Sequence, residues 1–450
     1  MRDDSTMRYH FDHPSRVMHP RAMHGHSKIS RRQFLERLGL GFAATMGYSP
    51  LGRAIRKGHV AVIGGGYSGA TAAKYLRLAD PAIAVSLFER NGKFISCPGS
   101  NLVLGGERTI PDISFGYDML ALGYGISVLH DEVTDIDPIT RTVITAGGMQ
   151  RAYDRIIVAP GIDFRWEDID GYDEGVTTVL PHAWRTGEQV LLLRRQLAQM
   201  EDGGVVLISV PPKPFRCHAA PYERASQIAY YLASEKPASR IIILDANDDF
   251  SKQALFEQGW AEYYPGVITW VPDAQDGRVI RADAATRTLF TEFATYQGAV
   301  VNLIPPQRAG VIAQRVGLVD ESGWCPVNHR TFESTLHPGI HVIGDACMAG
   351  ALPKSGYAAN SAAKICAAAV AASINGNSPA EPSFVNTCYS LITPTHGISA
   401  AMVYRLEQGK IVKVEGAGGY SPLKASKIDR ELEARYARSW IKSITTDIFS

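Results

Sequence analysis

The sequence of 450 residues contains six cysteines, and none of them forms a C-x-x-C or C-x-x-C-H motif. It therefore predicts neither a zinc ribbon nor a covalently attached c-type haem on this chain, since both need closely spaced cysteines. An excess of one charge is also absent, because 46 lysines and arginines are matched by 45 aspartates and glutamates. We accordingly predict no nucleic-acid partner, which would need a basic surface. With 45% hydrophobic residues, the composition is that of a globular protein with a substantial core.

A membrane-spanning apolar run is missing at the N-terminus, although an export signal is present there. Arg31 and Arg32, followed by QFL and by a moderately apolar stretch over residues 38–47, resemble a twin-arginine signal. That stretch is too short to span a bilayer, and we predict no transmembrane segment. We assign residues 1–57 to the signal and leader, which predicts a periplasmic protein; a chance basic pair in a disordered tail is the alternative. No metal site is predicted, because the clustered histidines lie in this leader, at positions 10, 13, 19, 24 and 26.

A dinucleotide-binding fingerprint lies directly after the leader, within residues 59–89. An apolar run ends in a glycine-rich turn, a helical pattern follows, and a second apolar run closes on Glu89. In this pattern Gly64 permits the tight turn, Gly66 lets the backbone approach a pyrophosphate, and Gly69 lets the helix pack close to the strand. Glu89 is placed to accept hydrogen bonds from an adenosine ribose. A glycine turn in some other α/β protein is the alternative interpretation.

A second α/β unit should follow, with apolar strands over residues 205–210 and 240–245. It lacks the glycines of the first unit. Residues 211–217 read PPKPFRC where a second nucleotide-binding loop would lie. Because proline has no N–H and bulky side chains keep a phosphate away from the backbone, we predict that this unit binds no nicotinamide cofactor.

The chain is expected to return to the first unit at residues 300–304, and motifs of flavin-binding proteins flank that return. Before it, Pro160 and Gly161 follow an apolar strand and resemble the turn by which flavoproteins with two dinucleotide domains leave the FAD domain. After it, a strand runs into Gly344 and Asp345, whose carboxylate is expected to bind the ribityl chain of FAD. The next three candidates precede an alanine-rich helix whose N-terminus would face the flavin: Lys354, Ser355 and Gly356.

The predicted fold is α/β, with two Rossmann-like domains of the glutathione-reductase, or disulfide-oxidoreductase, type and a C-terminal α+β interface domain. The expected FAD domain comprises residues 58–171 and 301–378, the second domain residues 172–300, and the C-terminal domain residues 379–450. The last helical pattern carries an apolar stripe, formed by Ile428, Leu432, Tyr436 and Trp440. Packing of this stripe on its own domain is favoured over docking to a membrane or a partner.

Long motifs spread over nearly the whole chain after the leader resemble the flavoprotein subunit of flavocytochrome c sulfide dehydrogenase. These motifs include GGGYSGATAAKYLRLADP, SCPGSNLVLGG, YDRIIVAPGI, PPKPFRCHAAPYERASQIAYYL, GWCPV, HVIGDA, PKSGYAANS and NTCYSL. The resemblance implies that a thioether joins Cys97 to the 8α-methyl carbon of FAD, and that Cys217 and Cys388 form a redox-active disulfide. From the residues alone, each of the three is equally a free or structural cysteine, because Cys217 and Cys388 are far apart in sequence.

The function implied by the resemblance is the FAD-dependent oxidation of sulfide to sulfur or polysulfide, with electrons passed singly to a c-type cytochrome. The haem is expected on that partner subunit only, which predicts a heterodimer. Glu223 is a candidate for proton handling or else a helix-start acid favoured by the helix dipole. Lys354 is a candidate for stabilising negative charge on the reduced flavin or else a solvated surface lysine.

Three other functions stay open on the sequence. A sulfide:quinone oxidoreductase would share the fold and the sulfur chemistry but deliver electrons to a membrane quinone. An NADH-dependent disulfide reductase is disfavoured by the proline-rich loop at residues 211–217. An exported flavin-binding subunit without sulfide turnover is the third, and the substrate of the enzyme could equally be a thiol or a polysulfide.

Overall fold

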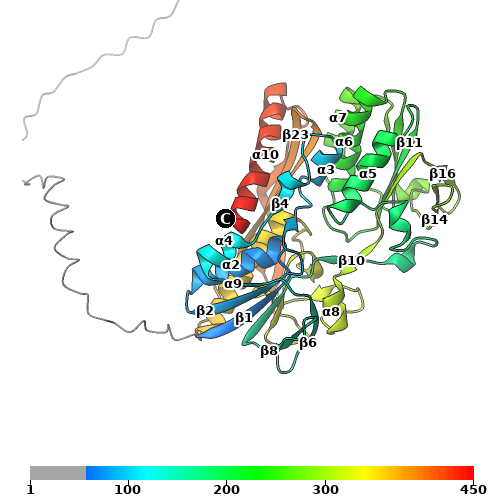
Figure 1. Ribbon diagram of the computed structural model, residues 1–450. Helices are drawn as coiled ribbons and strands as arrows, with labels where there is room; N and C mark the ends of the chain where they lie inside the picture. Colours follow the sequence, from blue (N-terminus) through cyan, green and yellow to red (C-terminus); the bar gives the residue numbers. More distant parts are fainter. Residues whose placement is uncertain (1–56) are drawn as a thin grey trace, which may run out of the picture. The chain divides into compact units, whose positions relative to one another are not determined.

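The computed structural model describes residues 57–450 (Figure 1). The predicted twin-arginine signal and its histidines lie outside these residues, so both stay predictions. Three sheets organise the described part of the chain. The first two are parallel and the third is antiparallel. This is the α/β class predicted from the alternation of apolar runs and helical patterns.

The first sheet has five parallel strands in the order β20-β9-β1-β2-β5. Their bounds are Ile340–Val342 (β20), Arg155–Val158 (β9), Gly58–Ile63 (β1), Ile83–Phe88 (β2) and Ser127–Leu129 (β5). Helices α2 (Tyr67–Ala79) and α9 (Gly356–Ile374) pack against each other beside the sheet. The order brings β20, from late in the chain, next to strands of the first 160 residues. Parallel strands end at one edge, so the loops after β1, β9 and β20 meet there.

The second sheet has four parallel strands in the order β13-β12-β11-β17. Their bounds are Ile268–Val271 (β13), Arg240–Asp245 (β12), Val205–Val210 (β11) and Val300–Leu303 (β17). The helices of this unit are Glu188–Gln199 (α5), Ala220–Glu235 (α6) and Gln253–Tyr263 (α7). The expected return of the chain at residues 300–304, and hence the boundary at residue 301, is wrong. All four residues of β17 are buried, and their backbone pairs with β11, so the chain leaves the second sheet only after Leu303.

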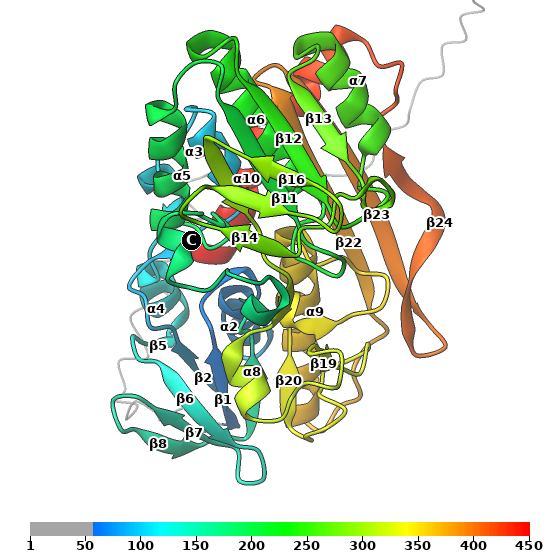
Figure 2. The same cartoon turned by 90° about the vertical axis from the view of Figure 1, so that its right-hand side faces the viewer.

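The third sheet joins the other two. It consists of β22 (Ser383–Thr393), β23 (His396–Glu407) and β24 (Lys410–Tyr420), and α10 (Lys427–Phe449) packs against β22 and β23. Strand β22 contacts α9 of the first unit and α6 and α7 of the second. In Figure 2 the three long strands extend along one side, from α7 to α9. A side chain on β22 can therefore reach the space between the first two units.

Smaller elements connect these three sheets. The helices are Ser100–Leu104 (α3), Asp118–Tyr124 (α4) and Val311–Arg315 (α8). Two three-stranded meanders comprise Val133–Asp137, Thr142–Thr145 and Gln150–Ala152 (β6 to β8), and Arg281–Asp283, Thr288–Phe290 and Thr295–Gln297 (β14 to β16). Two-stranded pairs are formed by Phe94–Ile95 with Ser114–Phe115 (β3, β4), Ile162–Phe164 with Gln307–Ala309 (β10, β18), and Cys325–Pro326 with Cys347–Met348 (β19, β21).

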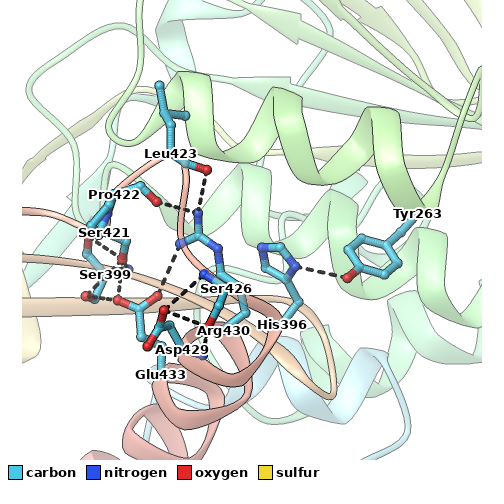
Figure 3. A network of polar contacts seen from close by, with 10 residues as sticks. All are labelled: Tyr263, His396, Ser399, Ser421, Pro422, Leu423, Ser426, Asp429, Arg430 and Glu433. Carbon is cyan, nitrogen blue, oxygen red and sulfur yellow. Dashed lines mark hydrogen bonds and ion pairs between the residues drawn. The ribbon is translucent and has the colours of Figure 1, made fainter. Parts of the chain in front are cut away.

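A buried polar network fastens α10 to the third sheet (Figure 3). Arg430 is buried, forms an ion pair of 3.3 Å with Glu433, and donates a hydrogen bond of 2.7 Å to the carbonyl of Pro422. Glu433 in turn accepts hydrogen bonds from the hydroxyls of Ser399 and Ser421. Buried charges of this kind are tolerated only when paired and hydrogen-bonded, so the network defines which face of α10 turns inward.

Two further contacts in Figure 3 flank this network. The side chains of Ser426 and Asp429 form a capping box at the start of α10. The imidazole of His396 lies 3.2 Å from the hydroxyl of Tyr263, which links β23 to α7. The capping box therefore closes the first turn of α10, and the contact with Tyr263 joins the third sheet to the second unit.

The predicted packing of the apolar stripe on α10 is wrong for three of its four residues, whereas the fourth, Trp440, is partly buried and packs against Tyr389 of β22. Ile428, Leu432 and Tyr436 are 76%, 41% and 49% exposed. The buried face is instead formed by Arg430, Ala434, Ala437, Ile441, Ile444 and Ile448. The pattern of residues four apart identified an apolar face correctly but not the direction it faces, because the ion pair of Arg430 lies on the opposite side of the helix.

Among residues 57–450, one helix is long and apolar enough to cross a membrane by length and composition. This helix is α9, and 56% of the apolar stretch is buried inside the protein. Buried core helices pass the same test, so the prediction that the chain has no transmembrane segment stays a prediction.

Candidate functional site

The glycine loop between β1 and α2 has the geometry that the fingerprint predicts. Gly64 has a φ of +97°, in the region that favours glycine. A β-carbon on Gly69 would lie 1.8 Å from the carbonyl oxygen of Gly64, so the helix can approach the strand only with glycine there. Gly66 caps α2 with no side-chain hydrogen bond, and a β-carbon there would meet only Phe94, at 3.5 Å. The N-terminal N–H groups of α2 are thus open to an anion.

Glu89 lies beside this loop, at the end of β2. Its carboxylate accepts hydrogen bonds of 2.9 Å from the backbone N–H groups of Gly65 and Asn91. Two carboxylate oxygens offer about four lone-pair sites, so the group can also accept from a ribose. The position predicted from the sequence is therefore available to a dinucleotide.

The two later flavin motifs, after β9 and after β20, lie at the same edge of the first sheet as the glycine loop. Pro160 and Gly161 follow β9, with a φ of +65° at Gly161. Gly344 has a φ of +78°, and a β-carbon there would lie 2.5 Å from the hydroxyl of Ser68. One oxygen of Asp345, Oδ1, is buried and has no hydrogen-bond partner among residues 57–450. Burial raises the pKa of this carboxyl group against the opposing charge of Arg216.

An unpartnered buried acceptor costs stability unless a donor completes it. Together with the open N-terminus of α2, Asp345 fits the hydroxyls of an FAD ribityl chain. The residues present are thus consistent with the predicted cofactor.

A cavity of about 480 Å³ opens next to these motifs and brings together all four predicted catalytic side chains. It lies among the first unit, the second unit and β22. Its lining includes Cys97, Cys217, Glu223, Lys354 and Cys388. Such a convergence of polar groups in one cavity is the usual form of a ligand site.

Cys97 lies in the loop between β3 and α3. Its sulfur is half-buried and accepts a hydrogen bond of 3.1 Å from the hydroxyl of Thr186. The side chain lines the cavity, where a thioether to a flavin could form.

Cys217 and Cys388 share the cavity as free thiols. Cys217 has a φ of +57°, and its N–H donates a hydrogen bond of 2.8 Å to the carbonyl of Lys354. Burial and then the charge of Asp345 raise the pKa of the Cys217 thiol, and Cys388 contributes to the same increase. The structure brings the two cysteines together; the bond between them stays a prediction.

Lys354 is not the solvated surface lysine that the sequence left open. Its ammonium donates hydrogen bonds of 2.9 Å to the carbonyls of Asp345 and Cys347, and it lies 3.8 Å from the ring centre of Trp324. Burial lowers the pKa of this lysine. Ser355 caps α9 by accepting a hydrogen bond from the N–H of Ala358, and Gly356 is the first residue of that helix.

Glu223 lies in the first turn of α6, as predicted, with one edge on the cavity. Its carboxylate accepts hydrogen bonds of 2.9 Å from the side chain of Asn101 and 3.0 Å from the N–H of Leu391. Burial raises the pKa of Glu223. A carboxyl group with a raised pKa, in a cavity that two thiols also line, suits proton transfer near neutral pH.

We expect the change Glu223→Gln to make stability less dependent on pH. The raised pKa means that the folded protein keeps this proton to a higher pH than the unfolded chain, whose ordinary value is 4.5. The contribution of Glu223 to the free energy of unfolding is therefore fully present below that value and is lost as the pH rises through the folded pKa. Urea unfolding at about pH 4 and about pH 7 should show a smaller loss in the variant. Equal losses in the two proteins would contradict this.

Comparison with known families assigns these regions. Residues 190–305 match the central region of the family described as sulfide dehydrogenase [flavocytochrome c] flavoprotein chain, and residues 380–449 match the flavin-binding region of flavocytochrome c sulphide dehydrogenase. Residues 58–198 match the pyridine nucleotide-disulphide oxidoreductase family. A sulfide dehydrogenase flavoprotein chain from Chlorobaculum thiosulfatiphilum is 54% identical over 44 residues, which are 92% of that sequence and 10% of this chain. The chain belongs to the flavoprotein family of flavocytochrome c sulfide dehydrogenase.

Other relatives and solved structures are more distant. Mitochondrial sulfide:quinone oxidoreductase from Mus musculus is 24% identical over 68% of each chain. The structure of sulfide:quinone oxidoreductase from Aquifex aeolicus has a TM-score of 0.69 at 17% identity, and the match covers 86% of this chain and 92% of that one. Putidaredoxin reductase in its complex with putidaredoxin has a TM-score of 0.61 at 16% identity, over 87% and 96% of the two chains. These structures share the fold, which confirms the predicted disulfide-oxidoreductase architecture.

Sequence reasoning missed several charged residues of this flavocytochrome-family site. Lys252 contacts the sulfur of Cys388, and Arg216 lines the cavity next to Cys217. Arg224 is buried and donates hydrogen bonds to Asn302, among others. Arg216 and Arg224 flank the predicted Cys217 and Glu223 in the sequence, which was an available signal. Nothing in the sequence marks Lys252, which precedes an ordinary helical pattern.

Within residues 57–450, no group of three histidine, cysteine, aspartate or glutamate side chains is arranged to hold a metal ion. The absence of a predicted metal site therefore stays a prediction for the whole chain.

Proposed function

We propose that this flavoprotein oxidises hydrosulfide to sulfur or polysulfide through a disulfide between Cys217 and Cys388, and that electrons pass singly to a c-type cytochrome on a separate subunit. One observation carries the proposal: Cys97, Cys217 and Cys388 come from three distant segments and line a single cavity beside Asp345. Membership of a sulfide-oxidising flavoprotein family supports the substrate class. The family name supports a cytochrome partner.

The chemical step at the cysteines is a thiol–disulfide exchange. Hydrosulfide attacks one sulfur, the S–S bond breaks, and the products are a persulfide on one cysteine and a thiolate on the other. When the disulfide forms again, one hydrosulfide ion has become a sulfur atom, one proton and two electrons. FAD, when bound, supplies the acceptor of that electron pair and can release electrons one at a time.

The residues of the chain have separate tasks in this scheme. The loop of Gly64 to Gly69, with Glu89, would bind the dinucleotide, and Asp345 would bind the ribityl chain. Glu223 is the candidate acceptor of the proton that is released when the disulfide forms again. Lys354, with its ammonium beside Asp345, would stabilise negative charge at that end of the cavity.

We further propose that Cys97 holds FAD through a thioether. Its sulfur lines the cavity in a loop that directly follows the predicted ribose-binding acid Glu89. Flavin should then stay with the polypeptide after denaturation in acid, and it should be released from the variant Cys97→Ser. Absorbance of the washed pellet measures this, and Cys366→Ala, a change in the core of α9, serves as the control. Complete release from the unchanged protein would refute the linkage.

The cellular location is part of the proposal. The twin-arginine pattern at Arg31 and Arg32 supports export to the periplasm, and that route carries proteins already folded around a cofactor. Fractionation of cells that express the full chain tests it. Export that persists after Arg31 and Arg32 are both changed to lysine would argue against the signal.

The decisive experiment is anaerobic. Sulfide and NADH are added separately to the mature protein, and the flavin absorbance is followed. Bleaching by sulfide alone supports the proposal, whereas bleaching by NADH alone would mean that the second unit binds a nicotinamide cofactor. In this unit Pro211 and Pro212 follow β11 and line a separate cavity of about 260 Å³, so the backbone there offers few N–H groups to a phosphate. Bound flavin that neither compound bleaches would favour an electron-transfer subunit without sulfide turnover.

The exposed apolar face of α10 favours a second candidate, in which the acceptor is a membrane quinone. Ile428, Leu432 and Tyr436 lie on that face. Flotation of the mature protein with lipid vesicles tests this, and changing all three to serine should abolish flotation if it occurs. The substitutions spare the buried side of the helix, which a deletion of residues 428–450 would destroy.

A further inference from the structure

Lys252 occupies an unusual position for a lysine. It is 5% exposed, and it precedes α7 with a φ of +65°. Few residues other than glycine, asparagine and aspartate adopt a positive φ of this kind. A cation at the N-terminus of a helix is also unfavourable, because the helix dipole is positive there. Strained backbone and buried charge of this kind are concentrated at functional sites.

The contacts of the ammonium account for its position. Its Nζ donates hydrogen bonds to the carbonyl of Cys388 at 3.1 Å and to the hydroxyl of Ser390 at 3.0 Å. The third contact is with the sulfur of Cys388, at 3.3 Å. All three N–H groups of the lysine are therefore directed at β22.

This buried cation has no carboxylate within ion-pair distance among residues 57–450. Glu223 is near enough to feel its charge, but the oxygens of Glu223 accept hydrogen bonds from Asn101 and Leu391. Buried lysines are rare unless they are paired with an anion. The group in contact that can become an anion is the thiol of Cys388.

The other cysteine of the pair has the opposite environment. Cys217 is close to the carboxylate of Asp345, and burial together with that charge raises the pKa of its thiol. The half-buried Arg216 opposes this effect only in part. Negative charge is therefore disfavoured on Cys217 and favoured on Cys388.

We propose that Lys252 is a catalytic residue that stabilises Cys388 as the thiolate of the reduced pair. The proposal rests on the function proposed above and assigns the two cysteines. Hydrosulfide attacks the Sγ of Cys217, the S–S bond breaks, and its electron pair leaves on the Sγ of Cys388. The proton of hydrosulfide stays on the new persulfide of Cys217, and charge is conserved. In such exchanges the thiol that is more readily ionised is the better leaving group.

Other titratable groups line the cavity around this pair. They are Cys97, Cys217, His218, Glu223, Lys213, Asp249, Lys354, Tyr357, Tyr389, Tyr404 and Tyr420, together with the cations Arg216 and Arg224. Lys213 is the useful comparison, because its ammonium is also on the cavity wall but is paired with Asp249. A general effect of positive charge would appear with both lysines, whereas the proposed effect belongs to Lys252.

The variant Lys252→Asn tests the role of the charge. Asparagine tolerates a positive φ and is a good helix N-cap, so the change should not lower Tm. The mature flavin-loaded protein is reduced anaerobically with a phosphine and treated briefly with iodoacetamide at several pH values. Mass spectrometry then measures the alkylation of each cysteine. At about pH 7 we expect Cys388 to react at least about ten-fold more slowly in the variant, because the cation that stabilises its thiolate is gone.

Two controls accompany this measurement. Lys252→Arg should keep most of the reactivity of Cys388, because it keeps a cation, and Lys213→Gln should leave that reactivity unchanged. Alkylation of Cys388 at an unchanged rate in Lys252→Asn would overturn the proposal. So would an equal loss in Lys213→Gln.

The assignment of the persulfide has its own readout. After one equivalent of sulfide is added to the oxidised protein and the reaction is quenched before the disulfide forms again, alkylation should label a peptide of Cys217 that is one sulfur atom heavier than the labelled thiol. The same mass on the peptide of Cys388 would reverse the assignment. Alkylation of the reduced protein involves no sulfide, so a failure of sulfide oxidation and a failure of the Lys252 role are separate results.

Discussion

Cys388→Ser should abolish the reduction of the flavin by sulfide while leaving the flavin bound. A serine hydroxyl cannot form the disulfide that hydrosulfide attacks, and it does not ionise near neutral pH. Loss of the reacting group of a site typically lowers the rate by a factor of at least about a thousand. Cys388 lies on β22, away from the glycine loop after β1 that would bind the dinucleotide, so retention of FAD should be normal.

Stopped-flow absorbance with sulfide under anaerobic conditions measures this effect, and dithionite shows that the bound flavin is still reducible. Cys366→Ala is the matched control, because Cys366 is buried within α9 and does not line the cavity. The control should keep its rate within a few-fold. Unimpaired reduction of the flavin in Cys388→Ser would exclude the disulfide mechanism.

The second large effect is expected from Gly69→Ala. The added β-carbon would lie 1.8 Å from the carbonyl oxygen of Gly64 and 3.2 Å from the β-carbon of Ala159. The carbonyl oxygen of Gly64, and its carbonyl carbon at 3.0 Å, are backbone atoms, so α2 must move away from β1 to relieve the clash. Overpacking in a core typically costs about 1–3 kcal/mol, and here it also displaces the N-terminus that would bind the pyrophosphate.

We therefore expect the purified variant to contain little FAD and to unfold several degrees below the unchanged protein. The ratio of flavin absorbance to protein absorbance and a thermal melt measure the two effects. Gly92→Ala is the control, since a β-carbon there meets no atom within 4 Å. Normal flavin content in Gly69→Ala would mean that the loop tolerates a wider separation of strand and helix.

The features that the sequence determined are those governed by neighbouring residues. The strand, glycine turn and helix of residues 58–79 follow from local sterics, because Gly64 and Gly69 form a tight turn wherever such a segment folds. The turn at Gly344 and Asp345 is local in the same way. Continuous apolar runs such as β11 and β12 predict buried parallel strands. Both faces of a parallel sheet are covered by other elements, so side chains on both sides of the strand are apolar.

What only the tertiary structure decided depends on contacts between distant segments. Strand β17 could belong to either parallel sheet until its partner β11 was known. The apolar stripe with Ile428 was identified, but the buried ion pair of Arg430 and Glu433 turned it to solvent. In both cases the strand or helix was predicted correctly from the local pattern. Its packing partner lies in another part of the chain and could not be predicted in that way.

The catalytic cavity is the clearest example of this division. The motif that contains Cys217 and the motif that contains Cys388 were visible in the sequence, but residue spacing could not pair them. Lys252 carried no signal, because a lysine before a helix is ordinary until it is buried against a sulfur atom. Burial and electrostatic pairing depend on every segment around a site, so they are determined only when β22, α7 and the two parallel sheets have come together.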